Sequence, residues 1–359
     1  MQFHHLIAKE ADTKSMQSVI LAGGKGTRLR PLTIHTPKPV VPIVNRPFLT
    51  YQIELLKRAG VTDITLSLSY QPGKIEEIFA DGQDYGVRIH YAVEASPLGT
   101  AGAYKNAQEH LSETAIVFNG DVLTDMDLEA IVAFHKAKKA AATVVLVPVE
   151  NVSAFGVVET DAEGRVQRFL EKPKPEETTA NTINAGCYIL EPHVLNYVPA
   201  GESFSFEYQL FPALLAAGEP FYAYTWPGYW LDIGTPQRYL QAHYDLIGDK
   251  VKLQRIEREA LPTFSGEGEP PNVDRRSVVD PSCTLKAGVE IINSVIGPNC
   301  IIEDRARIED SVIWAGSRVG TAAVIRRSAV GRSGIIGRNS VVEDAFLGDK
   351  TSLTDYTIA

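Results

Sequence analysis

A glycine-rich segment that carries only basic charges lies near the start of the chain. Residues 21–39 read LAGGKGTRLRPLTIHTPKP, and residues 13–53 contain several Lys and Arg but no Asp or Glu. Glycine lets backbone N–H groups approach a phosphate closely. The protein as a whole has a net charge of −9. In such an acidic protein, this segment predicts a local anion-binding site.

Two common phosphate-binding loops do not fit this segment. A Walker A loop needs Ser or Thr after its lysine, whereas Lys25 is followed by Gly26. A dinucleotide-binding fingerprint that starts at Gly24 and Gly26 needs a third glycine where Leu29 stands. The segment therefore predicts a phosphate site of another class.

The pattern GGxGTRLxPLT with PKP downstream resembles the signature of the sugar-nucleotide pyrophosphorylases, which are nucleotidyltransferases. Further motifs follow in that family's order: SPLGTAGA (96–103), FNGD (118–121), FGVVE (155–159), LEKP (170–173), NAGCY (184–188) and GYWLDIGTP (228–236). The resemblance covers nearly the whole chain. It implies in-line attack by an oxygen of a sugar 1-phosphate on the α-phosphorus of a nucleoside triphosphate (NTP), with release of pyrophosphate.

The resemblance also implies the residues that carry the reaction. Arg28, Lys38 and Asp121 match catalytic positions, with Arg28 on the triphosphate and Lys38 on the α-phosphate or the incoming phosphate. Asp121 and Asp232 match metal ligands for a Mg²⁺ cofactor, which prefers oxygen ligands. An isolated Asp at a strand end more commonly forms a turn, so the metal assignment rests on the resemblance. Asp125 and Asp127 are interpreted as loop and helix-cap residues.

The remaining site residues are assigned by the same motifs. The predicted nucleotide-binding residues are Leu21, Ala22, Gly23, Gly24, Gly26, Thr27, Glu94, Pro97, Gly99 and Thr100. The predicted sugar-phosphate-binding residues are Gly156, Glu171, Lys172, Asn184, Gly186 and Trp230, of which Lys172 matches the sugar-phosphate lysine. Trp230 forms either a wall of the sugar pocket or part of the core.

Glu94 bears on the choice of nucleotide. It lies where thymidylyl-transferring relatives usually carry Gln, and an ionised carboxylate only accepts hydrogen bonds. Guanine offers two adjacent donors, whereas thymine and uracil present one donor between two acceptors. Together with GTAGA (99–103) and FNGDV (118–122), Glu94 makes the chain most similar to the mannose-1-phosphate guanylyltransferases of the family. Thymidylyl-, uridylyl- or adenylyltransfer to glucose 1-phosphate, and a non-catalytic regulatory subunit, remain alternatives.

The elements that must position these residues follow from hydrophobic periodicity. Between residues 18 and 244, short apolar runs alternate with amphipathic stretches, which predicts an α/β, Rossmann-like nucleotidyltransferase domain with a mixed sheet. We expect strands at 18–22, 64–69, 87–93, 115–119, 143–149 and 184–190, a helix at 47–59 and a hairpin around 161–164. The expected boundaries are an N-terminal extension (1–15), a catalytic domain (16–247), a linker (248–272) and a C-terminal domain (273–359).

The C-terminal domain repeats its aliphatic residues at steps of six, six and five, starting at Val279, Leu285 and Ile291. Small residues stand two positions earlier at most steps. This pattern predicts a triangular parallel β-helix, and the resemblance to hexapeptide-repeat proteins implies that it is left-handed. Such proteins also include acyltransferases with a histidine base, but all eight histidines precede residue 279. We therefore expect the β-helix to serve assembly into a homo-oligomer.

Composition narrows the setting. The chain has 359 residues, of which 44% are hydrophobic and 22% charged, as in ordinary globular proteins. The negative net charge argues against nucleic-acid binding, and no apolar run is long enough to span a membrane. Three cysteines without a CxxC pair indicate neither a disulfide framework nor a zinc site. A cytoplasmic enzyme that binds an NTP and a sugar 1-phosphate is the expectation.

Overall fold

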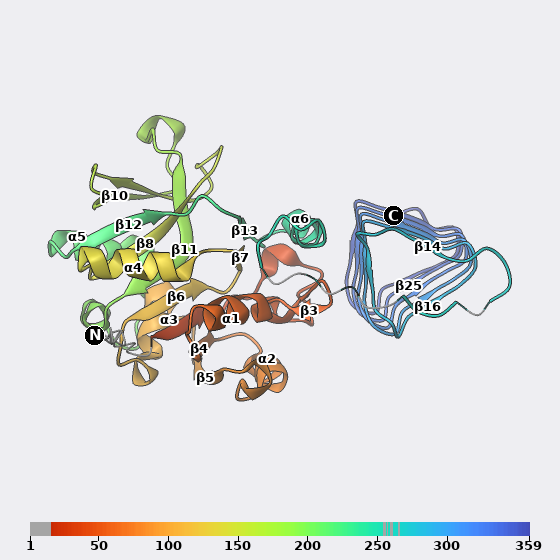
Figure 1. Ribbon diagram of the computed structural model, residues 1–359, viewed down its shortest axis with the longest axis horizontal. Helices are drawn as coiled ribbons and strands as arrows, with labels where there is room; N and C mark the ends of the chain where they lie inside the picture. The colour runs from red at the N-terminus through yellow and green to blue at the C-terminus, as the bar shows by residue number, and fades with distance from the viewer. Residues whose placement is uncertain (1–15, 254–255, 257, 259–260, 265) are drawn as a thin grey trace, which may run out of the picture.

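The computed structural model describes residues 16–359 except 254, 255, 257, 259, 260 and 265. The expected N-terminal extension (1–15) lies outside the described residues, as do parts of the expected linker. An α/β part built from β1 to α6 is followed by a prism built from β14 to β28 (Figure 1). No helix among the described residues has the length and apolar character needed to cross a membrane.

The α/β part is organised around one mixed sheet. Its nine described strands include the path β10-β9-β11-β6-β1-β4-β5, with β8 between β11 and β12. Strands β1, β4, β5 and β6 pair in parallel, and β11 runs antiparallel to β6. The bounds are β1 (Gln17–Leu21), β4 (Asp63–Leu68), β5 (Arg88–Val93), β6 (Ala115–Asn119), β8 (Ala142–Pro148), β9 (Gly156–Thr160), β10 (Val166–Glu171), β11 (Thr182–Leu190) and β12 (Phe221–Thr225).

Five helices of the described chain flank this sheet: α1 (Leu49–Arg58), α2 (Pro72–Phe79), α3 (Gly99–Asn106), α4 (Leu128–Lys138) and α5 (Phe211–Ala216). A further helix, α6 (Pro236–Ile247), packs against the ladder strand β13 and lies on the side of the α/β part that faces the β-helix (Figure 1). The expected cap residue Asp127 accepts a hydrogen bond from the N–H of Ala130 at 2.9 Å at the start of α4. The helix expected at 47–59 begins only at Leu49, because β3 (Arg46–Pro47) pairs with β2 (Pro42–Ile43).

Shorter elements connect these helices and strands. The short helices of the described chain are η1 (Thr27–Leu29), η2 (Lys38–Val40), η3 (Gln83–Tyr85), η4 (Gln108–His110), η5 (Pro175–Glu177), η6 (Pro192–Tyr197) and the π-helix η7 (Phe206–Leu210). A separate ladder joins β7 (Val122–Thr124) to β13 (Trp230–Asp232). The hairpin expected around 161–164 is present between β9 and β10, where the N–H of Asp161 donates to the carbonyl of Arg165.

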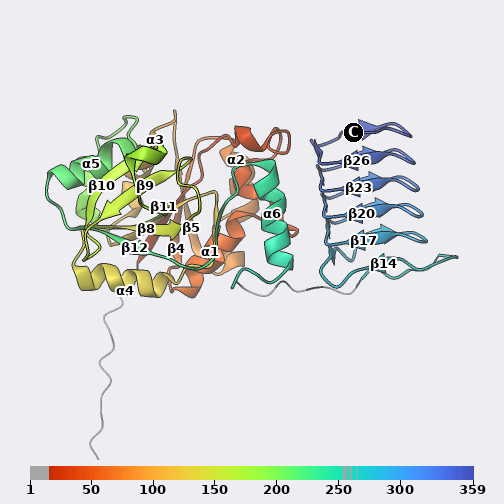
Figure 2. The same cartoon turned by 90° about the horizontal axis from the view of Figure 1, so that it is seen from above.

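The C-terminal prism confirms the left-handed parallel β-helix, and Figure 2 shows its stacked coils. Three five-stranded parallel sheets form its sides within residues 272–353. The first holds β14 (Asn272–Val273), β17 (Glu290–Ile292), β20 (Arg307–Glu309), β23 (Val324–Arg326) and β26 (Val341–Glu343). The second holds β15 (Val278–Val279), β18 (Val295–Ile296), β21 (Val312–Ile313), β24 (Ala329–Val330) and β27 (Phe346–Leu347). The third holds β16 (Thr284–Leu285), β19 (Ile301–Ile302), β22 (Arg318–Val319), β25 (Ile335–Ile336) and β28 (Ser352–Leu353).

The small residues of the repeat have a role beyond close packing. The N–H of Ser311 donates to Ser294 Oγ at 3.0 Å, and the N–H of Ser328 donates to Ser311 Oγ at 3.1 Å. Each hydroxyl therefore bridges two neighbouring coils at a buried corner. The sequence predicted only the small size of these side chains, whereas the structure adds a ladder of hydrogen bonds that satisfies backbone donors.

The α/β part and the β-helix share one hydrophobic core. It combines residues within and just after the glycine-rich segment with residues of α6 and of the second β-helix sheet: Leu29, Leu32, Val41, Ile43, Val44, Phe48, Tyr239, Leu240, Leu246, Val295, Val312, Trp314 and Ala329. One side of the prism is thus covered by the same chain.

Candidate functional site

Two adjoining cavities lie beside the carboxyl ends of β1 and β6. The first cavity has a volume of about 340 Å³ and is lined by the glycine-rich segment, Glu94 and α3. The second cavity has a volume of about 720 Å³ and is lined mainly by residues of β11, β13 and the β9–β10 hairpin. Asn119 and Asp121 line both. The two cavities therefore meet at the end of β6.

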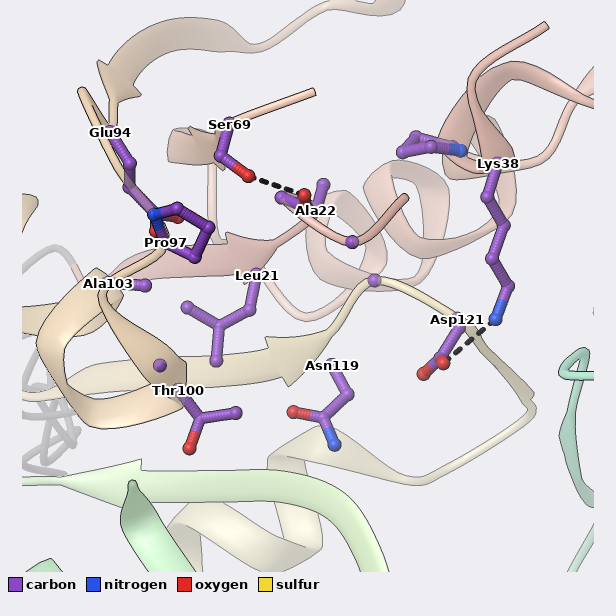
Figure 3. A pocket seen from close by; sticks show the side chains of 15 residues that line it. Leu21, Ala22, Lys38, Ser69, Glu94, Pro97, Thr100, Ala103, Asn119 and Asp121 are labelled. Carbon is purple, nitrogen blue, oxygen red and sulfur yellow. Dashed lines mark hydrogen bonds and ion pairs between the residues drawn. The ribbon is translucent and has the colours of Figure 1, made fainter. Parts of the chain in front are cut away.

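The glycine-rich segment is fixed against the wall of the first cavity. Ser69 Oγ donates to the carbonyl of Gly23 at 2.6 Å (Figure 3). A Cβ on Gly23 would lie 2.9 Å from Glu94 Oε1 and 3.0 Å from Ser69 Oγ, so a larger residue there would have to displace these side chains. A Cβ on Gly24 would meet no atom within 4 Å. Space for a ligand is therefore left at Gly24 and not at Gly23.

Glu94 closes one end of the first cavity and is 8% exposed. Its Oε2 accepts from the N–H of Leu98 at 2.9 Å, and its Oε1 accepts from Ser67 Oγ at 3.3 Å. Burial raises the pKa of Glu94, and the hydrogen bonds from Leu98 and Ser67 oppose that rise. Each carboxylate oxygen has more than one acceptor direction. The held carboxylate can therefore still accept hydrogen bonds from a ligand.

A pair of carboxylates lies where the two cavities meet. Asp121 precedes β7 and Asp232 ends β13, and the β7–β13 ladder brings them together across more than a hundred residues of sequence. The N–H of Ile233 donates to the carbonyl of Asp121 at 2.9 Å, which fixes their relative position. Lys38 Nζ lies 2.8 Å from Asp121 Oδ2 and 4.0 Å from Asp232 Oδ1. The ammonium thus faces both carboxylates.

Only one carboxylate oxygen of Asp232 is hydrogen-bonded within the described part of the chain. Its Oδ2 accepts from Arg238 Nη1 at 3.2 Å, whereas its buried Oδ1 has no hydrogen-bond partner among the described residues. Burial and the charge of Asp121 raise the pKa of Asp232, while nearby cations including Lys38 and Arg28 oppose the rise. A Cβ on Gly234 would lie 3.1 Å from Arg28 Cζ, so this glycine leaves room for the guanidinium.

These two carboxylates suit a hard divalent cation. Such ions bind one or two carboxylates and complete their coordination with water and substrate phosphates. The buried oxygen of Asp232 that lacks a hydrogen bond is a fitting ligand, because a cation would satisfy it. No group of three or more His, Cys, Asp or Glu residues in the described part of the chain is arranged as a metal site. The other ligands would come from substrate and water.

The floor of the second cavity is formed by β11. The side chain of Asn184 accepts from the N–H of Gly186 at 3.0 Å. Gly186 has φ 69°, and a Cβ there would lie 2.6 Å from Asn119 Nδ2. Trp230 Nε1 donates to the carbonyl of Ala185 at 2.9 Å, and its half-buried ring lines the cavity. Trp230 therefore lines the cavity and also packs against the hydrophobic core, so both of its expected positions apply.

Acidic and basic side chains gather at the outer side of the second cavity. Lys172 Nζ lies 3.8 Å from Glu171 Oε1. Burial and the charge of Glu207 raise the pKa of Glu171, and the charge of Lys172 opposes that rise. Glu207 itself lies in η7 and accepts from Thr100 Oγ1 at 3.3 Å. Carboxylates and a lysine thus line one cavity.

The structure gathers nearly all the predicted site residues around the two cavities. In the first lie Leu21, Ala22, Gly23, Gly24, Lys38, Glu94, Pro97, Gly99, Thr100 and Asp121. In the second lie Arg28, Asp121, Gly156, Glu171, Lys172, Asn184, Gly186, Trp230 and Asp232. Gly26 and Thr27 line neither: Gly26 has φ 60° in the turn before η1, and the exposed Thr27 begins that helix.

Several cavity residues were not predicted, namely Ser69, Asn119, Glu207, Thr235 and Arg238. Asn119 and Thr235 stand inside quoted motifs, so those motifs could have indicated them. Glu207 and Arg238 lie in stretches with no recognisable motif, and only the folded chain brings them to the site. Asp125 is a loop residue as expected: its carboxylate accepts from the N–H groups of Tyr229 and Lys252.

Comparison with known proteins identifies two matching families. Residues 17–248 match the family described as nucleotidyl transferase, and residues 273–359 match the GMPPB C-terminal domain. A mannose-1-phosphate guanylyltransferase of Mycobacterium tuberculosis is 39% identical over 317 residues, which are 88% of this chain and 84% of the relative. A UTP–glucose-1-phosphate uridylyltransferase of Synechocystis sp. is 38% identical over 330 residues, which are 86% of this chain and 85% of the relative.

A solved structure agrees with the fold. The crystal structure of HddC from Yersinia pseudotuberculosis complexed with GMP-PN matches with a TM-score of 0.55 and 32% identity, over 64% of this chain and 98% of that chain. The first family match alone spans most of the α/β part. The family match covers residues 17–248, and both relatives match this chain over most of their own length. The chain therefore belongs to the nucleotidyl transferase family.

Proposed function

We propose that the protein transfers GMP from GTP to mannose 1-phosphate, giving GDP-mannose and pyrophosphate. The observation that carries the proposal is the order of groups along the two cavities. Glu94 lies at the base end of the first, Lys38 and the carboxylate pair lie at the junction, and Glu171 and Lys172 lie in the second. This order matches the order of parts in a sugar nucleotide.

The assignment of guanine rests on Glu94. Its buried carboxylate is oriented by Leu98 and Ser67 and retains acceptor capacity for the adjacent N1–H and 2-amino donors of guanine. The Mycobacterium tuberculosis relative bears the name of a guanylyltransferase, and HddC was solved with GMP-PN. Both support a guanine nucleotide in the first cavity.

The chemistry requires positive charge more than a protein base. An oxygen of the ionised sugar phosphate forms a bond to the α-phosphorus, the bond from that phosphorus to the β-phosphate oxygen breaks, and pyrophosphate leaves. We assign Arg28 to the triphosphate and to the charge that develops on it. Lys38 is assigned to the α-phosphate or the incoming phosphate. Both act by holding two anions together and by electrostatic stabilisation.

We assign a divalent metal ion, Mg²⁺, to Asp121 and Asp232. The unsatisfied Oδ1 of Asp232 and its position beside Asp121 support this assignment. When bound, the ion supplies charge stabilisation to the triphosphate. Arg238 orients Asp232 through Oδ2, which leaves Oδ1 free for the ion.

The sugar 1-phosphate is assigned to the second cavity. Lys172 contacts its phosphate, Glu171 and Asn184 accept hydrogen bonds from sugar hydroxyls, and Trp230 forms a wall. Glucose and mannose differ in the orientation of one hydroxyl. The Mycobacterium tuberculosis relative supports mannose, whereas the Synechocystis relative supports uridylyltransfer to glucose 1-phosphate as a second candidate.

The division of the chain is part of this proposal. We propose a catalytic domain at 16–247, a connecting linker at 248–272 and an assembly domain at 273–359. The β-helix would then pair with other protomers through its two uncovered sides or its ends, because open edges of stacked strands invite pairing.

Pyrophosphate release tests the proposed function. The protein is assayed with Mg²⁺ and each of GTP, dTTP, UTP, ATP and CTP, combined with mannose or glucose 1-phosphate. GTP with mannose 1-phosphate is expected to give the highest kcat/KM. A higher value for UTP with glucose 1-phosphate would favour the second candidate, and no release with any pair would identify a non-catalytic subunit.

A further inference from the structure

The segment that carries Lys38 lies between the carboxylate pair and the β-helix. This lysine segment, residues 36–45, contains only η2 and β2 as regular elements. Lys38 reaches Asp121 on one side with a side chain that is 10% exposed. Such a short, irregular segment has few backbone hydrogen bonds of its own, so its position depends on what packs against it.

The lysine segment is connected to the β-helix first through Trp314, which follows β21 and is fully buried. Its Nε1 donates to the hydroxyl of Tyr239 in α6 at 2.8 Å. That hydroxyl donates in turn to the carbonyl of Pro42 at 2.7 Å. A relay of two hydrogen bonds therefore runs from the β-helix to the lysine segment, inside the shared core.

Two further contacts reach the ends of the segment. Asn45 Nδ2 donates to the carbonyl of Ile296 in β18 at 2.9 Å. Arg332, which follows β24, has its guanidinium 5.7 Å from the ring of Trp314, and its Nη1 donates to Thr36 Oγ1 at 3.4 Å. These contacts come from the same β-helix sheet. One face of the prism thus holds both ends and the middle of the lysine segment.

The turn of the β2–β3 hairpin adds a second, independent observation. Val44 has φ 46° and Asn45 has φ 62°. A β-branched residue is rarely found in this left-handed region, and it persists there only when the surroundings hold it. Val44 is 4% exposed in the shared core, and its N–H donates to His243 Nδ1 at 3.3 Å. The strained turn is therefore retained by contacts with α6 and the β-helix.

We propose that the β-helix positions Lys38 for catalysis, with Trp314, Asn45 and Arg332 as positioning residues. The inference rests on the proposed function, in which Lys38 contacts the reacting phosphates. A lysine has a long flexible side chain, and its ammonium can be placed reproducibly only when its backbone is fixed. The β-helix supplies that fixed backbone from the face that packs against the α/β part in the shared core.

The test uses the substitution Asn45→Gly in the full-length protein. Glycine adopts positive φ without strain, so the turn is kept while the hydrogen bond to Ile296 is lost. The carbonyl of Ile296 still accepts from the N–H of Asp280, so no buried acceptor is left unsatisfied. Asn339→Gly is the matched control, because Asn339 also has positive φ (55°) but lies exposed in a turn of the β-helix. Trp314→Phe, which removes only the indole N–H donor and part of the ring, is the second variant.

Two measurements are made on each variant: steady-state kinetics with GTP and mannose 1-phosphate, and hydrogen exchange of peptides covering residues 36–48. Loss of one hydrogen bond at this segment is expected to lower kcat about three- to tenfold with both KM values within about twofold. Exchange of residues 36–48 is expected to be faster in Asn45→Gly and Trp314→Phe and unchanged in Asn339→Gly.

The proposal is overturned if both variants keep kcat close to that of the active wild type, or if Asn339→Gly loses as much activity as Asn45→Gly. If the wild type releases no pyrophosphate, the proposed function fails instead. Hydrogen exchange then decides the positioning alone: unchanged protection of residues 36–48 in both variants overturns it.

Discussion

Replacing Glu94 by Gln changes the base end of the first cavity while keeping its shape. The N–H of Leu98 can donate only to an oxygen, so the amide oxygen of the new side chain is expected to keep that hydrogen bond and the amide nitrogen to replace Oε1. A donor then faces the adjacent donors of guanine. At least one charge-assisted hydrogen bond is lost, about 1.5–3 kcal/mol. The preference for GTP over UTP in kcat/KM is therefore expected to fall about tenfold to a hundredfold.

The assay is pyrophosphate release with mannose 1-phosphate at saturating Mg²⁺, with GTP and UTP varied in separate series. The melting temperature serves as the control for folding. A GTP/UTP ratio within about twofold of the wild-type ratio, in a variant of normal stability, would refute the reasoning that Glu94 reads guanine.

The pH dependence supplies a second arm for the same prediction. Burial raises the pKa of Glu94, so its carboxylate takes up a proton at a higher pH than an exposed glutamate does. A protonated Glu94 loses acceptor capacity toward guanine. The KM for GTP is therefore expected to rise as the pH falls toward the raised pKa, and this part of the pH dependence is expected to be absent in Glu94→Gln.

Three further predictions concern the loop, the metal site and assembly. Gly24→Ala is expected to fold normally, since its Cβ meets nothing within 4 Å, but to raise the KM for GTP about fivefold or more because the methyl group occupies ligand space beside Gly24. Gly23→Ala is expected to be less stable, because its Cβ would contact Glu94. Asp232→Asn is expected to lower kcat about a hundredfold or more and to raise the Mg²⁺ concentration at half-maximal rate, whereas Asp127→Asn, which still caps α4, is expected to match the wild type in both. Sedimentation at micromolar concentration is expected to give a multiple of the mass of one chain, and a single-chain mass would contradict the homo-oligomer.

The β-helix could be predicted from the sequence because its information is local and repeated. Each coil places Val279, Ile296 and their equivalents inward at a fixed step, so one rule accounts for the whole prism. The hydrogen bonds between serines of neighbouring coils were not predicted from the sequence. A serine such as Ser294 or Ser311 can be required at a corner either for its small size or for its hydroxyl, and the sequence does not distinguish the two. Only the stacking of coils shows which of the two is used.

The site was less accessible to sequence reasoning where it depends on long-range pairing. No local pattern indicates that β7 pairs with β13, and the position of Asp232 beside Asp121 depends on that ladder. Glu207 reaches the second cavity through a π-helix that no motif indicates. The hydrogen-bond relay from Trp314 through Tyr239 to the lysine segment joins separate parts of the chain, and hydrophobic periodicity assigns each part only its own core.

The central claim is that GMP is transferred to a sugar phosphate by attack on the α-phosphorus. Reaction of mannose 1-phosphate with GTP labelled with ³²P at the α-position, followed by separation of the products, tests it most directly. We expect the label to appear in GDP-mannose and the pyrophosphate to be unlabelled. Label in pyrophosphate, or in free GMP without GDP-mannose, would contradict the claim.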